Sequence, residues 1–126
     1  MRIEPFADFE HIWRVEGFDK EYQKLFAKSK QEYVSCLEEL YRNLAMLDSG
    51  DVSDRKTFEK IENNLYAIRS NRRRVNPRVL YTAVLNDGRY ILLLPFAEKS
   101  KTDYEEGKRR ARAQIRALLG GKYHDT

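Results

Sequence analysis

The stretch that decides the fold is residues 78–96, RVLYTAVLNDGRYILLLPF. It contains two apolar runs, 78–85 and 90–96, on either side of Asn86-Asp87-Gly88. An Asp-Gly pair between apolar runs is a strong hairpin signal, because both residues tolerate the positive φ angles of a tight turn. The stretch therefore predicts a β-hairpin, and Pro95 is expected to mark the point where its ladder of hydrogen bonds ends.

Two shorter runs predict further strands. Residues 65–70 (LYAIRS) alternate as a strand does, and residues 11–18 (HIWRVEGF) are rich in β-branched and aromatic side chains. Residues 57–62 precede the turn signal Asn63-Asn64 and are expected to form a short turn or helix. Residues 1–10 show no steady period, so a loosely packed arm is expected there.

Helical spacing dominates the regions before and after these strands. Apolar residues recur every three or four positions from 19 to 47, which predicts one long helix or a helical hairpin that breaks at Ser29. A last helix is predicted from Thr102 to about Leu119, opened by the capping box Thr102-Asp103-Tyr104-Glu105 and stopped by Gly120-Gly121. Residues 122–126 are expected to be a frayed tail.

These elements predict one α+β domain over residues 1–126. The expected order is an N-terminal strand, a helical hairpin, three antiparallel strands and a C-terminal helix, with the helices packed on one face of the sheet. A chain of this length has room for one hydrophobic core and little else.

Charge is unevenly placed along the chain. The formal net charge is only +4, but residues 69–116 contain 13 basic and 5 acidic residues, an excess of eight. Such an excess predicts a surface that binds a polyanion, with an ordinary solvated basic face as the alternative. The composition, 41% hydrophobic and 35% charged, is that of a folded protein and not of a disordered chain.

Several classes of protein are excluded by what the sequence lacks. A single cysteine, Cys36, cannot form an internal disulfide, and no apolar run is long enough to span a membrane. The N-terminus lacks the basic start and apolar stretch of a signal peptide, so a cytoplasmic protein is expected. No metal or small-molecule cofactor is expected, because the sequence has neither clustered metal-ligand residues nor a glycine-rich phosphate-binding motif.

Four ordered motifs occupy the second half of the chain: LYAIR (65–69), PRVLY (77–81), ILLLPF (91–96) and KSKTDY (99–104). In this order they resemble the RelE/HigB toxins of bacterial toxin–antitoxin pairs, and most closely their phage-derived HigB-like branch. The resemblance covers residues 58–119, and the N-terminal half fits the family in element order but not in residues. It implies a small RelE-like sandwich, metal-free cleavage of messenger RNA on the ribosome, and a cognate antitoxin protein as partner.

The resemblance also implies site residues. Arg78 begins a strand where the similar toxins carry a phosphate-contacting arginine, and Arg69 would lie beside it across the sheet. Tyr104 takes the place of a tyrosine that helps activate the 2′-hydroxyl or stacks on a base, although a buried helical stripe also explains it. Lys99 and Lys101 stand where relatives place basic groups that protonate the leaving oxygen or steady the phosphate.

Other charged residues are assigned to binding, or weighed as a general base. The expected RNA-backbone contacts are Arg72, Arg73, Arg74, Lys108 and Arg109. Glu98 and Asp103 are the acids near the last helix that are considered as a base, and Asp103 is more simply explained as favouring a helix N-terminus. His11 and His124 are poorly placed for that role.

Two other functions remain open on the sequence. One is a ParE-like toxin that binds a protein target such as DNA gyrase and has no nuclease activity, since the same fold serves both. The other is an inactive module that binds RNA or protein. Some relatives carry lysines on the strand where this chain has Tyr66, Ala67 and Ile68, which weakens the match to a nuclease site.

Overall fold

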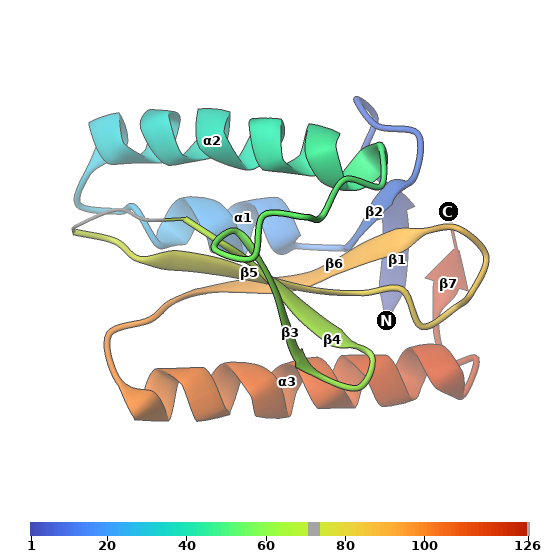
Figure 1. Cartoon of the computed structure of the whole chain (residues 1–126). Helices are drawn as coiled ribbons and strands as arrows, with labels where there is room; N and C mark the ends of the chain where they lie inside the picture. Colours follow the sequence, from blue (N-terminus) through green and yellow to red (C-terminus); the bar gives the residue numbers. More distant parts are fainter. Residues whose placement is uncertain (71–73, 126) are drawn as a thin grey trace.

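A mixed β-sheet runs through the middle of the computed structural model, which describes residues 1–70 and 74–125 (Figure 1). The strands lie in the order β3-β4-β5-β6-β2-β1-β7. Neighbours are antiparallel except that β2 runs parallel to β6 and β1 parallel to β7. Their bounds are β1 Arg2–Pro5, β2 Ile12–Val15, β3 Phe58–Glu62, β4 Leu65–Arg69, β5 Pro77–Thr82, β6 Tyr90–Ala97 and β7 His124–Asp125.

The hairpin predicted from residues 78–96 is present as β5 and β6. Its connection is longer than predicted, because β5 ends at Thr82 and residues 83–89 lead to β6. Positive φ angles occur at Asn86 (55°) and Gly88 (88°) and not at both residues of the expected Asp87-Gly88 pair. The expectation for Pro95 is wrong, because Pro95 pairs with Val79 and β6 continues to Ala97. The pairing with β2 covers Tyr90 to Leu92. In the described structure one edge of β6 is therefore open at Pro95, where a residue without an N–H is tolerated.

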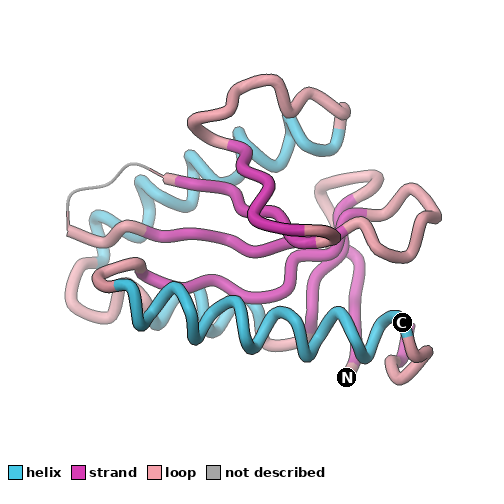
Figure 2. Tube along the Cα trace, turned by 60° about the horizontal axis from the view of Figure 1, so that its bottom comes forward, coloured by secondary structure: helices cyan, strands magenta, loops and turns pink. Residues whose placement is uncertain are grey.

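Helices cover both faces of the sheet, and the predicted α+β class is confirmed. Helices α1 (Phe18–Lys24) and α2 (Lys30–Asp48) lie on one face, and α3 (Lys101–Leu119) lies on the other (Figures 1 and 2). The expectation that all helices pack on one face is wrong. The physical reason is that β5 is buried at every position, so both of its faces need an apolar cover.

Two apolar clusters follow from this arrangement. Side chains from α1 and α2 pack with Val79, Tyr81 and Leu92 on one face of the sheet. On the other face, Ala111, Ile115 and Leu118 of α3 pack on Leu80, Ile91 and Leu93. Cys36 is a buried residue of the first cluster.

The helix boundaries agree with the sequence, but the caps differ in part. The break at Ser29 is confirmed, although its backbone carbonyl accepts from the Tyr33 amide while its side chain makes no capping hydrogen bond. Helix α3 ends at Leu119 as expected. It is capped by Ser100, whose Oγ accepts from the Asp103 amide at 3.3 Å, so the capping box at Thr102 is wrong.

Three segments expected to be irregular or helical are strands. Residues 57–62 provide β3, which pairs with β4 across the Asn63-Asn64 turn. The expected arm contains β1, and the expected tail contains β7, whose His124 amide donates to the Met1 carbonyl at 2.8 Å. Pairing with a neighbouring strand satisfies these backbone groups, and neither end has an apolar pattern that predicts it.

Candidate functional site

Five side chains from five parts of the fold meet on the α3 side of the sheet. We call them the Arg78 cluster, and its members are Glu59 of β3, Arg69 of β4, Arg78 of β5, Glu98 after β6 and Tyr104 in the first turn of α3. Arg69 and Arg78 are register partners, as the sequence predicted. Glu59 reaches both because β3 lies beside β4 at this end of the sheet.

Arg78 is the most buried charged group of the cluster, with its side chain 9% exposed. Its Nη2 lies 2.5 Å from Oε2 of Glu98, and its Nη1 lies 3.5 Å from Oε2 of Glu59. Its Nε is buried without a hydrogen-bond partner among the described residues. Since burying an unpaired guanidinium is costly, the two carboxylates are what stabilise Arg78 in this position.

Glu59 connects the cluster. Its Oε2 lies 3.2 Å from Nη1 of Arg69, and its Oε1 accepts a hydrogen bond from the Tyr104 hydroxyl at 3.3 Å. A carboxylate between two guanidinium groups also offsets the repulsion between like charges directly opposite each other on neighbouring strands. Glu59 is therefore both a structural link and a proton acceptor within reach of Tyr104.

The Tyr104 ring packs against the Arg78 guanidinium and the Phe96 ring. The Arg78 guanidinium lies 5.4 Å from the centre of its ring, and the Phe96 ring meets it edge to face at 6.0 Å. Burial raises the pKa of Tyr104, and the charge and hydrogen bond of Glu59 raise it further, against an opposing effect of Arg78. At neutral pH the hydroxyl is therefore protonated and acts as a donor.

The arrangement brings together the groups that phosphodiester chemistry needs. It holds a carboxylate that can accept a proton, a phenol that can donate one, and two guanidinium groups that suit phosphoryl oxygens. Its charges are balanced, with two arginines against two carboxylates. Because both Nη atoms of Arg78 already pair with carboxylates, a phosphate that binds these atoms must replace one of the carboxylate partners.

The basic residues of α3 are mostly paired with acids. Lys108 lies 3.0 Å from Glu105 and 4.8 Å from the centre of the Tyr104 ring, so it borders the cluster. Arg109 is exposed and paired with Glu106. Two more arginines join α3 to other elements, Arg110 through Glu21 of α1 and Arg112 through Glu62 of β3.

The remaining predicted residues lie outside the cluster. Lys99 and Lys101 are exposed at the start of α3, and neither has an ion-pair partner in the described part of the chain. Arg74 is also exposed, and it lines a groove together with Lys99. Arg72 and Arg73 lie outside the described residues.

Glu59 is the site residue that the sequence reasoning missed, because residues 57–62 were expected to be a turn or helix. The segment itself carries no strand alternation, since Phe58 and Ile61 are three positions apart, and the available signal was the two-asparagine turn that follows it. Asn64 has a φ angle of 66°, as such a turn requires. Glu98, considered as a base, contacts Arg78, whereas Asp103 accepts from the Lys99 amide at 3.2 Å.

Histidine and metal sites do not contribute to this arrangement. His11 pairs with Asp48 near the end of α2, and His124 lies in β7. Among residues 1–70 and 74–125, no group of three or more His, Cys, Asp or Glu side chains is placed to hold a metal ion. Within the same residues, no helix is both long and apolar enough to cross a membrane.

No protein-family model matches the chain, and no curated protein matches it. What the fold and the cluster define is a small α+β protein with a buried arginine held by two carboxylates and a tyrosine.

Proposed function

We propose that the protein is the toxin component of a toxin–antitoxin system and that it cleaves messenger RNA on the ribosome without a metal ion. The observation that carries the proposal is the mutual contact of Glu59, Arg78 and Tyr104. These three residues offer a base, a cation for the phosphoryl group and a proton donor in one place. The resemblance of residues 58–119 to RelE/HigB toxins supports the same assignment.

In the proposed reaction, Glu59 accepts the proton of a ribose 2′-hydroxyl. The 2′-oxygen then attacks the adjacent phosphorus, and the bond from phosphorus to the 5′-oxygen breaks. Tyr104 donates its proton to the departing 5′-oxygen and recovers one from Glu59, to which it is hydrogen-bonded. The products are a 2′,3′-cyclic phosphate and a 5′-hydroxyl, and both residues return to their starting protonation states.

Arg78 stabilises the charge that builds on the phosphoryl oxygens. In this proposal the scissile phosphate takes the place of Glu98 at the Arg78 guanidinium. The exchange replaces one anion with another, so the buried arginine stays paired throughout. Arg69, held by Glu59 on the exposed side of the cluster, is the second cation for the phosphate.

A second function is favoured by a different observation. The carboxylates that neutralise Arg78 leave it without a free donor pair for RNA, which is the state expected of a structural ion-pair network. A structural network of this kind is sufficient for a ParE-like toxin, which binds a protein target such as DNA gyrase. It is also sufficient for an inactive binding module. In the toxin proposals the partner is a cognate antitoxin protein, with acidic segments that complement the basic surface.

The test is cell-free translation with the purified protein, followed by primer extension on the message with and without ribosomes. Glu59→Gln and Tyr104→Phe are the informative variants, because each keeps the shape of the side chain. The matched controls are Glu62→Gln, on the same strand as Glu59, and Tyr66→Phe. The Tyr66 side chain packs with the apolar cluster on the α1–α2 face, away from the Arg78 cluster. The proposal is supported if the message is cut within codons only when ribosomes are present, and if both Glu59→Gln and Tyr104→Phe abolish the cuts. An intact message with normal translation would refute it.

A further inference from the structure

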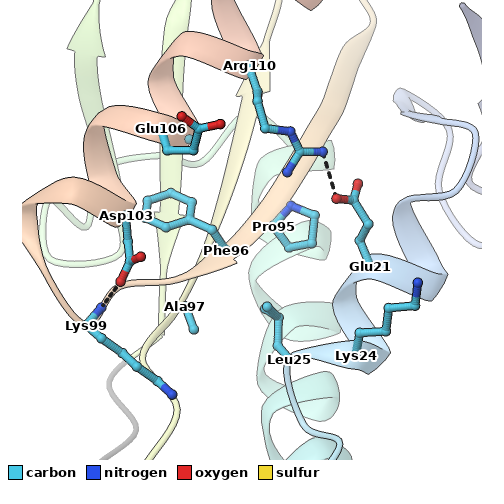
Figure 3. A pocket seen from close by; sticks show the side chains of 11 residues that line it. Glu21, Lys24, Leu25, Pro95, Phe96, Ala97, Lys99, Asp103, Glu106 and Arg110 are labelled. Atoms are coloured by element: carbon cyan, nitrogen blue, oxygen red, sulfur yellow. Dashed lines mark hydrogen bonds and ion pairs between the residues drawn. The ribbon is translucent and has the colours of Figure 1, made fainter.

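Two adjoining hollows lie near the end of β6, beyond the point where its pairing with β2 ends. The first, of about 450 Å³, lies between α1, β6 and the start of α3 (Figure 3). The second, of about 420 Å³, continues from it toward the chain that precedes β5. They share Lys24, Leu25 and Lys99, and in Figure 3 Lys24 and Lys99 stand on opposite sides of the opening.

We call the second hollow the basic groove. Four cationic side chains line it, and no acidic residue does so within the described chain. Lys24 and Lys28 come from the end of α1 and the loop after it, whereas Arg74 precedes β5 and Lys99 follows β6. All four are exposed, and none has an ion-pair partner among residues 1–70 and 74–125.

This groove differs from the basic surface of α3. There, Lys108, Arg109, Arg110 and Arg112 are each held by a carboxylate. An ion-paired arginine must give up its partner before it binds another anion, whereas an unpaired lysine releases only its own counterions. The unpaired cations of the groove therefore combine Arg74 and Lys99 from the basic stretch 69–116 with Lys24 and Lys28 from outside it.

We propose that the basic groove binds the phosphate backbone of single-stranded RNA and directs the strand to the Arg78 cluster. The inference rests on the proposed function in taking the strand to be the substrate. The two places meet at the end of β6, where Lys99 lines the groove and the preceding Glu98 pairs with Arg78. The groove walls Phe26 and Val75 belong to the apolar cluster on the α1–α2 face, whereas the Arg78 cluster lies on the α3 face. A strand in the groove therefore reaches the ion pair by crossing the end of the sheet beside Lys99 and Glu98.

The walls of the groove favour a nucleic acid backbone over an acidic protein. Of its four apolar members, Phe26 and Val75 are only 2% and 9% exposed, and the surface that remains comes from the half-buried Leu25 and the small side chain of Ala27, so a protein partner meets little apolar surface. Because Phe26 is buried, its ring is not available for stacking on a base. Recognition is then electrostatic and independent of sequence, as phosphate contacts are. The Val75 amide donates to Glu32 at 2.8 Å, which ties this wall of the groove to α2.

The test is fluorescence anisotropy with a labelled 2′-O-methyl oligouridine, which lacks the hydroxyl needed for cleavage, titrated with the full chain at several salt concentrations. Lys24→Ala/Lys28→Ala removes one side of the groove, and Arg74→Ala/Lys99→Ala removes the other. Lys56→Ala/Lys122→Ala is the matched control, since it removes two exposed lysines that do not line the groove. Circular dichroism checks that each variant is folded.

Each groove variant is expected to bind about 25-fold more weakly at 0.1 M salt and to lower the slope of log affinity against log salt by about 1.4, as two lost single-strand phosphate contacts predict. The control is expected to bind like the wild type. Equal weakening by all three variants would overturn the inference. So would binding of a polyglutamate peptide in preference to the oligonucleotide, because the occupant would then be an acidic protein.

The same variants separate this inference from the proposed function. Groove-dependent binding by a protein that leaves messages intact on ribosomes supports the groove and refutes the nuclease. Ribosome-dependent cleavage with unchanged oligonucleotide binding in both groove variants supports the nuclease and refutes the groove.

Discussion

Arg69 and Arg78 lie directly opposite each other on neighbouring antiparallel strands, and one carboxylate, Glu59, contacts both guanidinium groups at 3.2 and 3.5 Å. Two like charges in this register repel each other. The carboxylate turns the pair into a stable arrangement, and its second oxygen accepts from Tyr104. The same residue thus supports the fold and provides the base of the proposed reaction.

Glu59→Gln is expected to lower the free energy of unfolding by about 2 kcal/mol, because Arg78 then remains buried with one carboxylate and faces an unscreened Arg69. Urea denaturation at neutral pH measures the change. The control Glu62→Gln breaks a more exposed pair with Arg112 and is expected to cost at most about 0.5 kcal/mol. Equal losses in the two variants would contradict the central role of Glu59.

Tyr104 is expected to ionise above pH 10, since burial and Glu59 raise its pKa. The difference in absorbance at 295 nm between the wild type and Tyr104→Phe, followed through an alkaline titration, reports this phenol. Tyr66→Phe, compared with the wild type in the same way, gives the absorbance change expected when a tyrosine outside the cluster is removed. A transition of the Tyr104 phenol below pH 9 would contradict the raised pKa and the contact with Glu59 that causes it.

Asp48 is expected to contribute to stability at neutral pH but not in acid. Burial acts to raise its pKa, but hydrogen bonds from the His11 and Glu10 amides and the His11 ring outweigh burial and lower the pKa. A carboxyl group with a lowered pKa stabilises the fold above its unfolded pKa of about 3.9, and this contribution is lost as the pH falls through the folded value. Asp48→Asn should therefore cost about 1 kcal/mol at pH 7.

The comparison of wild type and Asp48→Asn by urea denaturation from pH 7 to pH 3 checks this expectation. The two unfolding free energies should converge as the pH falls. A difference that stays constant over the whole range would mean that the charge of Asp48 does not stabilise the fold.

Ser100→Ala is expected to destabilise the protein by about 1 kcal/mol, because Ser100 Oγ accepts from the Asp103 amide at the start of α3. Thr102→Ala lies inside the helix and should change stability by less than about 0.5 kcal/mol. Thermal denaturation of the two variants distinguishes the positions. A larger effect at Thr102 would restore the capping box that the sequence predicts.

The sequence predicts the elements whose signal is local. The β5–β6 hairpin follows from apolar runs around a turn, and the break at Ser29 follows from a gap in helical spacing. The register of Arg69 with Arg78 also follows, because a connection between adjacent antiparallel strands brings their facing ends together. β1 and β7 have no such signal, since they are short strands paired in parallel across the ends of the chain.

The candidate site was only partly predictable for the same reason. Arg78, Arg69 and Tyr104 were named from the sequence, and the structure brings them together around Glu59, which lies 45 residues before Tyr104. The sequence predicts a chemical role for Lys99, but Lys99 lines the basic groove with Lys24 and Lys28 from the N-terminal half of the chain. Charge counts along a sequence do not show which cations are already paired.

By itself, the sequence determined the hairpin, the two helical regions and the basic character of the second half, because hydrophobic period, turn residues and charge are properties of neighbours along the chain. Only the tertiary structure decided which face each helix covers, which carboxylates neutralise Arg78 and which cations stay free. Those outcomes depend on distances of a few ångströms between residues far apart in sequence, where the Coulomb energy and the cost of burial change most steeply.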